Sequence, residues 1–308
     1  MPLISAKSIL EDANKNGYAV GAFNANNMEF LQAIFKAADS EKSPIIIAAS
    51  EGAMKYAGPE MFYSMVKTLS DKYSHIPVAL HLDHGSNISA VMTAVKAGFT
   101  SVMIDASHFP YEENLKLTKQ IVGICRTVGI SVEAELGRLQ GVEDNVSVAE
   151  RDAVLVNPEE AKDFVLASGI DFLAPAIGTS HGAFKFKGEA KLDLERLKKV
   201  KELTGIPLVL HGASSVPEAA SNIFEEFGGN LKGAKGVPSE VLKDAIKFGI
   251  NKVNTDTDLR IAFLAKVRES VSNDKSQIDP RKIFGPARDY VTEVIKDRMK
   301  VLGSSGRI

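Results

Sequence analysis

The chain has 308 residues, of which 44% are hydrophobic and 25% are charged, and its formal net charge at pH 7 is -2. This length and composition suit a globular protein with one large barrel or two small domains. The near-neutral charge and the lack of a lysine-rich patch remove the electrostatic case for nucleic acid, so we expect no nucleic-acid partner. The single cysteine, Cys125, excludes a disulfide framework and fits a reducing compartment.

The chain begins Met1-Pro2-Leu3-Ile4-Ser5, without a basic stretch that leads into an apolar run. No segment approaches the roughly 20 consecutive apolar residues that a membrane span needs. We therefore expect a cytoplasmic protein that has no membrane partner.

Short apolar segments alternate with helical patterns along most of the chain, after an amphipathic stretch at 5–16. The expected strands are 18–23, 44–49, 78–82, 101–104, 131–136, 172–177, 208–210 and 250–254. The expected helices are 28–38, 59–69, 88–97, 112–127, 192–203, 239–248 and 258–271. Eight strands that alternate with helices, with no place for a domain linker, predict one (β/α)8 TIM barrel as a single domain over residues 1–308. An open doubly wound sheet is disfavoured, because the turn after the first strand lacks the GxGxxG spacing.

Two connections are longer than the two to six residues usual in α/β units, and long loops in compact domains are usually functional. The connection 137–158 carries several charged residues, among them Glu143, and is predicted to act as a lid. The connection 212–238 holds a helix-like piece and a glycine-rich segment. The C-terminal extension, about 279–308, contains one more helix at 287–302, which we expect to pack outside the barrel or against another subunit.

The third expected strand ends in a cluster of polar side chains. Strand alternation places Ala79, His81 and Asp83 on one face, while His84 lies at the rim, where Gly85 lets the chain turn. Burying two imidazoles and a carboxylate without partners would cost several kcal/mol. These groups are therefore paired, bound to a metal or exposed at an open mouth.

Polar residues recur at the carboxyl ends of seven expected strands, the end at which such barrels carry their active sites. In strand order they are Ser50; Asp83 and His84; Asp105, Ser107 and His108; Glu133 and Glu135; Gly178-Thr179-Ser180-His181-Gly182; His211-Gly212-Ala213-Ser214; and Asn254-Thr255-Asp256-Thr257. The sequence therefore predicts that all of these strand ends converge on one rim.

Three of these ends supply a histidine followed by a glycine: His84, His181 and His211. Three neutral imidazoles with an open fourth position are what a catalytic zinc requires. The sequence therefore predicts a zinc site. His81 points inward on its strand and is either a further ligand or, in the interpretation we favour, a hydrogen-bonding residue behind the ligands.

Two carboxylates, Asp105 and Glu135, end adjacent strands and are compatible with a second or alternative metal position. The alternative is that they form ion pairs with lysines.

Glycines and hydroxyl groups cluster after the sixth, seventh and eighth strands. Backbone N–H groups at Gly182, Gly212 and Ala213, with the hydroxyls of Ser214 and Thr257, would form an anion cradle of the kind that barrels place after strands seven and eight. The alternative is that these residues form tight turns only. The cradle interpretation predicts a phosphorylated substrate.

With these residues assembled, the sequence resembles the class II, zinc-dependent fructose-1,6-bisphosphate aldolases over nearly the whole chain. The motifs that carry the resemblance are Ala22-Phe23-Asn24, Ser50-Glu51-Gly52, His81-Leu82-Asp83-His84-Gly85, Val132-Glu133-Ala134-Glu135-Leu136-Gly137, Gly178-Thr179-Ser180-His181-Gly182, Leu210-His211-Gly212-Ala213-Ser214 and Asn254-Thr255-Asp256-Thr257-Asp258-Leu259-Arg260. The length and the lid sequence are similar to those of the compact bacterial subgroup, which often forms tetramers.

The resemblance implies reversible aldol cleavage of fructose 1,6-bisphosphate to dihydroxyacetone phosphate and glyceraldehyde 3-phosphate, a reaction of glycolysis and gluconeogenesis. It implies that zinc held by His84, His181 and His211 acts as a Lewis acid on the ketose carbonyl. Asp83 would take the proton of the C4 hydroxyl in cleavage and return it in condensation. Glu143 on the lid would exchange a proton at carbon.

The resemblance also implies substrate and ion contacts. Those to dihydroxyacetone phosphate are Gly182, Gly212, Ala213, Ser214, Asn254, Asp256 and Thr257. Ser50 resembles a contact to the glyceraldehyde phosphate half, and Arg260 or, from a neighbouring subunit, Arg281 would bind the far phosphate. Asp105 and Glu135 resemble positions that hold a second or displaced zinc in some members. The family further implies a monovalent cation, Na+ or K+, near the phosphate and a homodimer or homotetramer.

Three alternatives stay open. A tagatose-1,6-bisphosphate aldolase would share the fold, the metal and the motifs, and only the chain length and the lid sequence favour fructose. A metal-dependent hydrolase barrel, in which zinc activates water, fits less well because the phosphate-cradle glycines are present and an early HxH strand motif is absent. A non-enzymatic surface role could only be additional. No strand-end lysine stands out as a Schiff-base nucleophile, which disfavours a metal-free aldolase.

Overall fold

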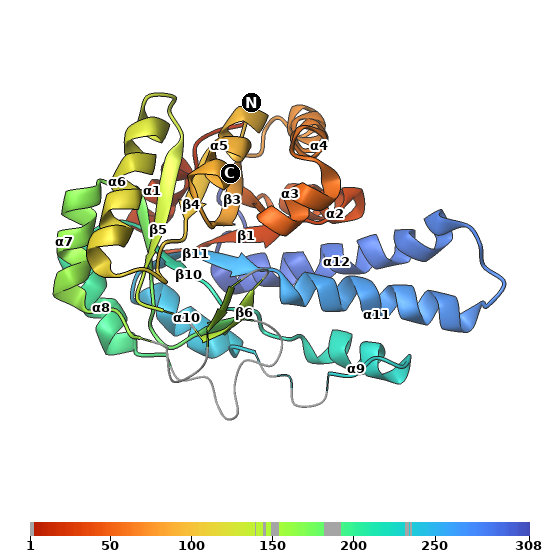
Figure 1. Ribbon diagram of the computed structural model, residues 1–308. Helices are drawn as coiled ribbons and strands as arrows, with labels where there is room; N and C mark the ends of the chain where they lie inside the picture. The colour runs from red at the N-terminus through yellow and green to blue at the C-terminus, as the bar shows by residue number, and fades with distance from the viewer. Residues whose placement is uncertain are drawn as a thin grey trace.

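Eight parallel strands close into a barrel in the order β1-β11-β10-β8-β5-β4-β3-β2, and helices cover its outside (Figure 1). The computed structural model describes residues 3–138, 140–143, 146–148, 154–181, 192–231, 234 and 236–308, and only the backbone of 140–143, 146–148 and 180–181. Neighbouring barrel strands are all parallel. The predicted (β/α)8 barrel is therefore confirmed.

The barrel strands are β1 (Val20–Asn24), β2 (Ile45–Ser50), β3 (Val78–Gly85), β4 (Ser101–Ile104), β5 (Ser131–Leu136), β8 (Phe172–Pro175), β10 (Leu208–Leu210) and β11 (Ile250–Thr255). The described helices are α1 (Ala6–Asn16), α2 (Met28–Glu41), α3 (Glu51–Ala57), α4 (Pro59–Lys72), α5 (Ile88–Ala97), α6 (Tyr111–Arg126), α7 (Pro158–Ser168), α8 (Leu194–Thr204), α9 (Glu218–Glu226), α10 (Ser239–Lys247), α11 (Thr257–Asn273) and α12 (Pro280–Leu302). None of them is long and apolar enough to cross a membrane.

Two described helices, α3 and α7, lie outside the predicted set. Helix α3 has only 7 residues, so its periodicity is too short to detect, although Ser50 caps its N-terminus. Helix α7 follows directly on the long connection, and its start is specified by Asn157 as the N-cap and Pro158 as the first helical residue. Capping residues rather than an apolar pattern therefore mark both helices.

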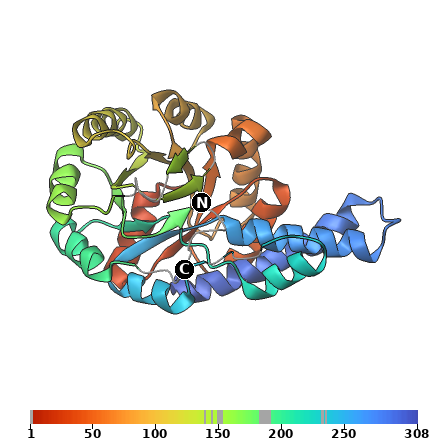
Figure 2. The same cartoon turned by 60° about the horizontal axis from the view of Figure 1, so that its bottom comes forward.

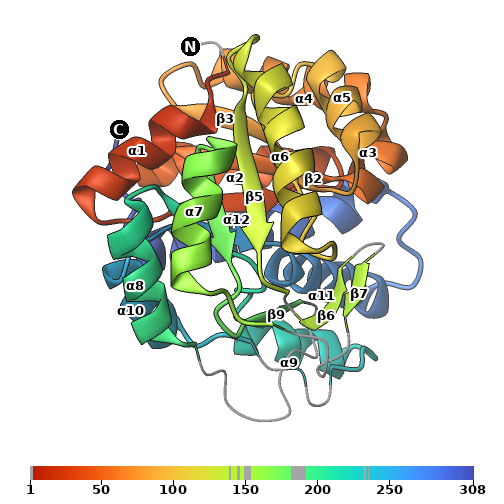
Figure 3. The ribbon, with the colours of Figure 1, turned by 60° about the vertical axis from the view of Figure 1, so that its left-hand side comes forward.

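A separate three-stranded sheet lies beyond the carboxyl end of β5 (Figure 3). It consists of β6 (Gln140–Glu143), β7 (Val146–Val148) and β9 (Ser180–His181). Strands β6 and β7 are antiparallel, while β9 runs parallel to β6 and places the backbone of His181 opposite Gly141. The predicted lid connection therefore contains a hairpin, and an antiparallel bridge between Arg138 and Val154 closes its base.

Side chains on the strands alternate between the barrel interior and the layer under the helices. On β3, Val78 and Leu80 belong to the large cluster packed against the helices, whereas Ala79 belongs to the smaller cluster inside the barrel. His81 and Asp83 follow Ala79 at intervals of two residues and are buried. The predicted inward direction of these residues is therefore confirmed.

Helices α11 and α12 form a hairpin that extends to one side of the barrel (Figures 1 and 2). Helix α12 begins at Pro280, earlier than the predicted start at 287, because Asp279 caps its N-terminus and Pro286 is accommodated inside the helix. On the outside of the barrel it packs against α2, where Lys36 Nζ lies 3.2 Å from Asp289 Oδ1. The expectation that this C-terminal helix packs outside the barrel is confirmed.

Candidate metal centre and substrate site

Asp83, near the carboxyl end of β3, is held by two side-chain amides. Asn24 of β1 donates to Asp83 Oδ2 at 2.7 Å, and Asn254 of β11 donates to Asp83 Oδ1 at 2.7 Å. Burial raises the pKa of Asp83, but the positive charges around it, first that of His84, outweigh burial and hold the pKa well below its usual range. The carboxylate is therefore ionised and fixed in direction, and both features suit a group that accepts a proton from a bound substrate.

Two buried amide oxygens beside Asp83 have no hydrogen-bond partner within the described part of the chain. They are Asn24 Oδ1 and Asn254 Oδ1, on the side chains whose Nδ2 groups hold Asp83. Buried polar groups in native proteins are nearly always paired, so such atoms mark the place where a polar ligand makes its bonds. A substrate with several hydroxyl groups fits this surplus of acceptors.

His84 has a φ of 50°, in the left-handed region that residues other than glycine rarely adopt. The β3–β4 register shifts between Leu82 and Gly85, so a bulge turns the His84 ring out of the strand. Strand β3 ends at Gly85, where the chain was predicted to turn, but the left-handed residue is His84 and not the glycine. Gly85 is needed for space, because a Cβ there would lie 2.6 Å from the carbonyl oxygen of Met103.

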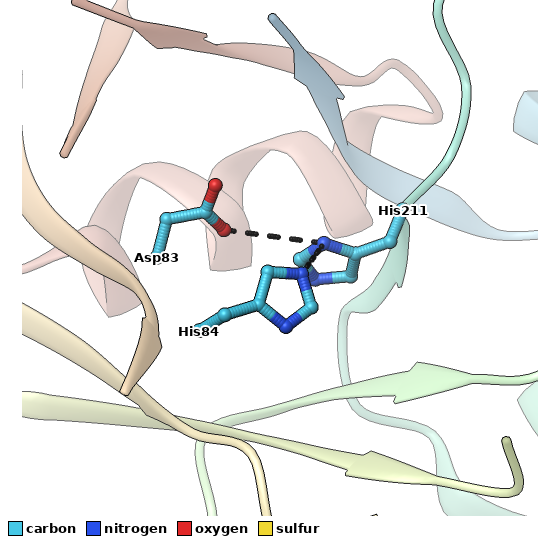
Figure 4. A group of neighbouring side chains, drawn as sticks. All are labelled: Asp83, His84 and His211. Atoms are coloured by element: carbon cyan, nitrogen blue, oxygen red, sulfur yellow. Dashed lines mark hydrogen bonds and ion pairs between the residues drawn. The ribbon is translucent and has the colours of Figure 1, made fainter. Parts of the chain in front are cut away.

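The rings of His84 and His211 lie next to each other beside Asp83, in an edge-on contact with their centroids 4.5 Å apart (Figure 4). His84 Nδ1 donates to Asp105 Oδ2 at 2.8 Å, and His211 Nε2 donates to Glu133 Oε1 at 2.6 Å. The other two ring nitrogens, His84 Nε2 and His211 Nδ1, lie 3.0 Å apart. Two nitrogens bound to one zinc at 2.0–2.1 Å with a tetrahedral angle stand about 3.3 Å apart. The spacing and the tautomers therefore fit a shared metal ion.

The pKa values of the two rings are consistent with a cation between them. Burial lowers the pKa of His84, but the hydrogen bond to Asp105 and the charge of Asp83 outweigh it and raise the pKa to about 10. Burial and the charge of His84 lower the pKa of His211. A proton on His84 Nε2 can therefore be donated to the lone pair of His211 Nδ1, and a metal ion bound to both nitrogens would take the place of this proton.

Two overlapping groups of side chains could hold a metal ion. The ligand atoms of Asp83, His84 and His211 lie within 4.8 Å of one another, and so do those of His84, Asp105 and Glu135. Glu135 Oε2 is buried and has no partner among the described residues. Burial and the charge of Asp105 raise the pKa of Glu135 well above its usual value. A metal ion would supply the positive charge that Glu135 lacks, and the second group therefore fits a metal as well.

Two predicted site residues are described by their backbone alone, and a third is not described. The backbones of His181 and Glu143 lie in β9 and β6, which pair with each other, but their side chains lie outside the described residues. Gly182 lies outside the described residues altogether. The pairing of β6 with β9 nevertheless joins the two strands that carry the predicted third zinc ligand and the predicted lid acid.

The loop after β10 is held in shape by α11 and α12. Asp258 of α11 accepts hydrogen bonds from the backbone N–H groups of Ser215 and Val216 at 2.9 and 2.8 Å. Arg298 of α12 is buried and donates to the carbonyl of Ala213 at 2.6 Å. Val216 has a φ of 52°, which is strained for a β-branched residue and persists only where the surroundings enforce it.

These contacts bring together most of the predicted anion cradle. Gly212 has a φ of 62°, and Ala213 and Ser214 follow it as buried residues. The loop is bonded to the first turn of α11, of which Thr257 is the first residue. The free N–H groups of a helix N-terminus attract anions, so this corner of the barrel is suited to a phosphate.

Ser50 and Arg260 are both engaged within the chain. Ser50 lies opposite Asp83 in the β2–β3 register, and its hydroxyl accepts from the N–H of Ala53 at 3.3 Å. Arg260 pairs with Asp256, the N-cap residue of α11, with Nε 2.7 Å from Oδ1. This contact uses Nε, so a far phosphate would approach the terminal nitrogens of the guanidinium.

Arg281 is not brought to the site of its own chain. It pairs with Asp279 at the start of α12, where its side chain is 89% exposed. The start of α12 lies at the tip of the α11–α12 hairpin, away from the barrel (Figure 1). Any contribution of Arg281 to a site therefore has to be made to another chain, as the resemblance implies.

Three residues next to the candidate centre are missing from the predicted site: Asn24, Glu133 and Lys252. Lys252 Nζ lies 2.8 Å from Glu133 Oε2, and both side chains are fully buried. Burial raises the pKa of Glu133, but the charge of Lys252 and the hydrogen bond from His211 outweigh it and lower the pKa to about 2. Strand alternation could have revealed these residues. Each lies two positions along its strand from an inward-facing residue, either a predicted site residue or an apolar residue of the barrel interior, so its own side chain also points inward.

Comparison with known proteins identifies the family. A sequence model described as "Fructose-bisphosphate aldolase class-II" matches residues 4–307. The chain belongs to this family. It is 60% identical over 306 residues to a fructose-bisphosphate aldolase of Helicobacter pylori (strain ATCC 700392 / 26695), covering 99% of this chain and 100% of the relative. It is 52% identical to one of Thermus caldophilus, covering 99% of each chain.

Solved structures agree with the family assignment. The YdjI aldolase from Escherichia coli K12 is 31% identical and covers 99% of each chain, with a TM-score of 0.80. The resemblance inferred from the motifs is therefore confirmed, and the class II aldolase assignment favours a lyase over a hydrolase.

Proposed function

We propose that this class II aldolase cleaves fructose 1,6-bisphosphate reversibly into dihydroxyacetone phosphate and glyceraldehyde 3-phosphate, in glycolysis and gluconeogenesis. The observation that carries the proposal is the buried Asp83 carboxylate, fixed by two amides, beside the adjacent rings of His84 and His211. Relatives named fructose-bisphosphate aldolase support fructose over tagatose as the sugar. The phosphate-suited corner at the start of α11 supports a phosphorylated substrate.

We further propose that zinc is the metal, held by His84, His211 and His181. When bound there, zinc supplies Lewis acidity toward a carbonyl oxygen. Asp83 takes the proton from the substrate hydroxyl beside the bond that breaks, and returns it in condensation. Glu143, carried by β6, exchanges a proton at carbon.

A second or alternative metal position is formed by the carboxylates Asp105 and Glu135. Their ligand atoms lie within 4.8 Å of each other and of a ring nitrogen of His84, and both side chains are buried. The two positions share His84, so a metal ion could move between them with this ring as the common ligand.

The proposed substrate contacts surround this centre. They are Ser50, Gly182, Gly212, Ala213, Ser214, Asn254, Asp256, Thr257, Arg260 and Arg281. We propose that the chain forms a single domain and a homodimer or homotetramer, in which Arg281 serves a neighbouring subunit. A monovalent cation, Na+ or K+, near the phosphate and a cytoplasmic location complete the proposal.

A coupled cleavage assay tests this function. Purified protein receives fructose or tagatose 1,6-bisphosphate, and a dehydrogenase that reduces dihydroxyacetone phosphate reports the product through NADH. We expect faster cleavage of fructose 1,6-bisphosphate, loss of activity after chelation and recovery with zinc. Dihydroxyacetone phosphate added to the chelated sample controls for the coupling enzyme. If the zinc-loaded protein cleaves neither sugar, the proposal fails; faster cleavage of tagatose 1,6-bisphosphate would change the substrate.

A further inference from the structure

A layer of polar side chains that includes a buried ion pair lies inside the barrel, beneath the candidate metal centre. Lys252 of β11, Glu133 of β5 and His81 of β3 are each 0% exposed. Lys252 Nζ lies 2.8 Å from Glu133 Oε2 and 3.4 Å from His81 Nε2, and His81 Nδ1 lies 2.8 Å from Ser101 Oγ. Branched apolar side chains normally fill the interior of such barrels. The polar layer therefore needs an explanation.

Stability does not explain the buried ion pair. Each ion loses several kcal/mol of hydration on burial, and replacing both partners of such a pair by apolar residues is often neutral or stabilising. Val209 of β10 lies opposite Lys252 in the strand register and is an apolar member of the interior cluster. The barrel thus accepts an apolar side chain next to Lys252, so the lysine has another task.

The carboxylate of Glu133 connects Lys252 to the candidate metal centre, because its two oxygens bind different partners. Glu133 Oε2 accepts from Lys252, while Oε1 accepts from His211 Nε2 at 2.6 Å. His211 Nδ1, on the other side of the ring, faces His84 Nε2 at 3.0 Å. The carboxylate is therefore held at both ends, by the lysine on one side and by a candidate metal ligand on the other.

We propose that Lys252 is a positioning residue for the metal site. By holding Oε2 of Glu133, it fixes the direction of the carboxylate, so that Oε1 meets Nε2 of His211 and the ring presents Nδ1 to the metal. Removing a group that orients a metal ligand typically weakens metal binding 10–100-fold. The inference rests on the proposed zinc site and extends it to a residue that touches neither metal nor substrate.

A lysine inside an aldolase barrel could instead form a Schiff base with the ketose. That role needs a neutral amine within reach of the substrate carbonyl. Lys252 Nζ is enclosed between Glu133 and His81, two residues below Asn254 on the same strand face. Borohydride added with dihydroxyacetone phosphate therefore leaves the mass of the protein unchanged, whereas a reduced adduct on Lys252 would overturn the positioning role.

The main test compares Lys252→Met with Val209→Ala. Both remove atoms from neighbouring positions in the barrel interior, but only the first removes a partner of Glu133. Zinc dissociation constants are measured by competition with a chromophoric chelator, and melting temperatures on metal-free protein. We expect Lys252→Met to weaken zinc binding about tenfold and Val209→Ala to change it by less than about twofold. Equal zinc affinity in wild type and Lys252→Met would overturn the proposal.

A double variant covers the case in which Lys252→Met does not fold. Glu133→Gln combined with Lys252→Met leaves no unpaired buried charge, so the barrel tolerates it better. The amide oxygen at position 133 can still accept from His211, but nothing fixes its direction, and we again expect about a tenfold loss of zinc affinity. Wild-type affinity in this double variant would also overturn the proposal.

Cobalt(II) gives a readout that a packing defect alone does not move. The visible absorption of bound cobalt reports the geometry of its ligands. We expect the double variant to have shifted bands and Val209→Ala to retain the wild-type spectrum; an unshifted spectrum in the double variant would count against a positioning role. Neither binding readout uses substrate. If zinc binding follows this pattern but the wild-type protein cleaves no bisphosphate, the positioning role stands and the aldolase function is refuted. If the wild-type protein cleaves bisphosphate but the variants bind zinc with unchanged affinity, the aldolase function stands and the positioning role is refuted.

Discussion

Replacing Asn24 with alanine removes one of the two amides that hold Asp83, and the structure sets the size of the effect. Asn24 Nδ2 lies 2.7 Å from Asp83 Oδ2, and both side chains are buried. A hydrogen bond to a charged group contributes about 1.5–3 kcal/mol, and about 1.4 kcal/mol corresponds to a tenfold change in rate. Because Asn254 still holds the other oxygen, we expect kcat for cleavage to fall roughly 10- to 150-fold while zinc stays bound.

Asn27→Ala is a matched control for this variant. Asn27 lies three residues after Asn24, on the connection that follows β1, and caps α2 by accepting from the N–H of Phe30 at 3.0 Å. Loss of such a cap costs about 1 kcal/mol of stability and leaves Asp83 untouched. Steady-state kcat and KM are measured at saturating zinc, with thermal unfolding of each protein. Wild-type kcat in Asn24→Ala, or an equal loss in Asn27→Ala, would refute the reasoning.

Other predictions concern the metal, the phosphate corner and the buried thiol. His211→Ala should lose zinc, whereas Asp83→Ala should keep it and lose most turnover, as metal analysis beside the cleavage assay will show; full zinc and full activity in both would contradict the assignment. Asp258→Asn removes an acceptor from the strained loop after β10, so KM for the bisphosphate should rise roughly tenfold, in line with one charged hydrogen bond, with a smaller change in kcat. Burial raises the pKa of Cys125 to about 11, so at pH 8 its thiol should react with Ellman's reagent only after unfolding, and rapid reaction of the native protein would show that α6 opens.

The conformation at the end of β3 shows what the sequence could and could not predict. Alternation along β3 predicts that His81 and Asp83 share the inward face with Ala79, because successive side chains of a strand point to opposite faces. It does not predict the left-handed backbone of His84, since that region is normally occupied by glycine. A glycine directly after a polar strand end suggests that the glycine supplies the unusual backbone conformation, but His84 adopts it and Gly85 provides room for β4.

The buried ion pair was missed for a different physical reason. Glu133 and Lys252 lie below the carboxyl ends of the barrel strands. An inspection of strand ends alone therefore does not include Lys252, and it predicts no ion-pair partner for Glu133. Strand alternation places both on the inward face, but it does not show which inward residues meet. Strands β5 and β11 are not neighbours in the barrel, and their side chains touch only because they cross its interior. Such a contact depends on closure rather than on any local pattern.

Closure of the barrel also assembles the groups around Asp83. The first strand, β1, pairs with the last, β11, and Ala22 lies opposite Asn254 in their register. Asn24 and Asn254 therefore come together at the seam and reach the same carboxylate, although they lie at opposite ends of the barrel sequence. Each residue alone appears in the sequence as a polar side chain at a strand end. The direction of the carboxylate exists only once the last strand has joined the first, so the catalytic geometry belongs to the closed barrel and not to any one motif.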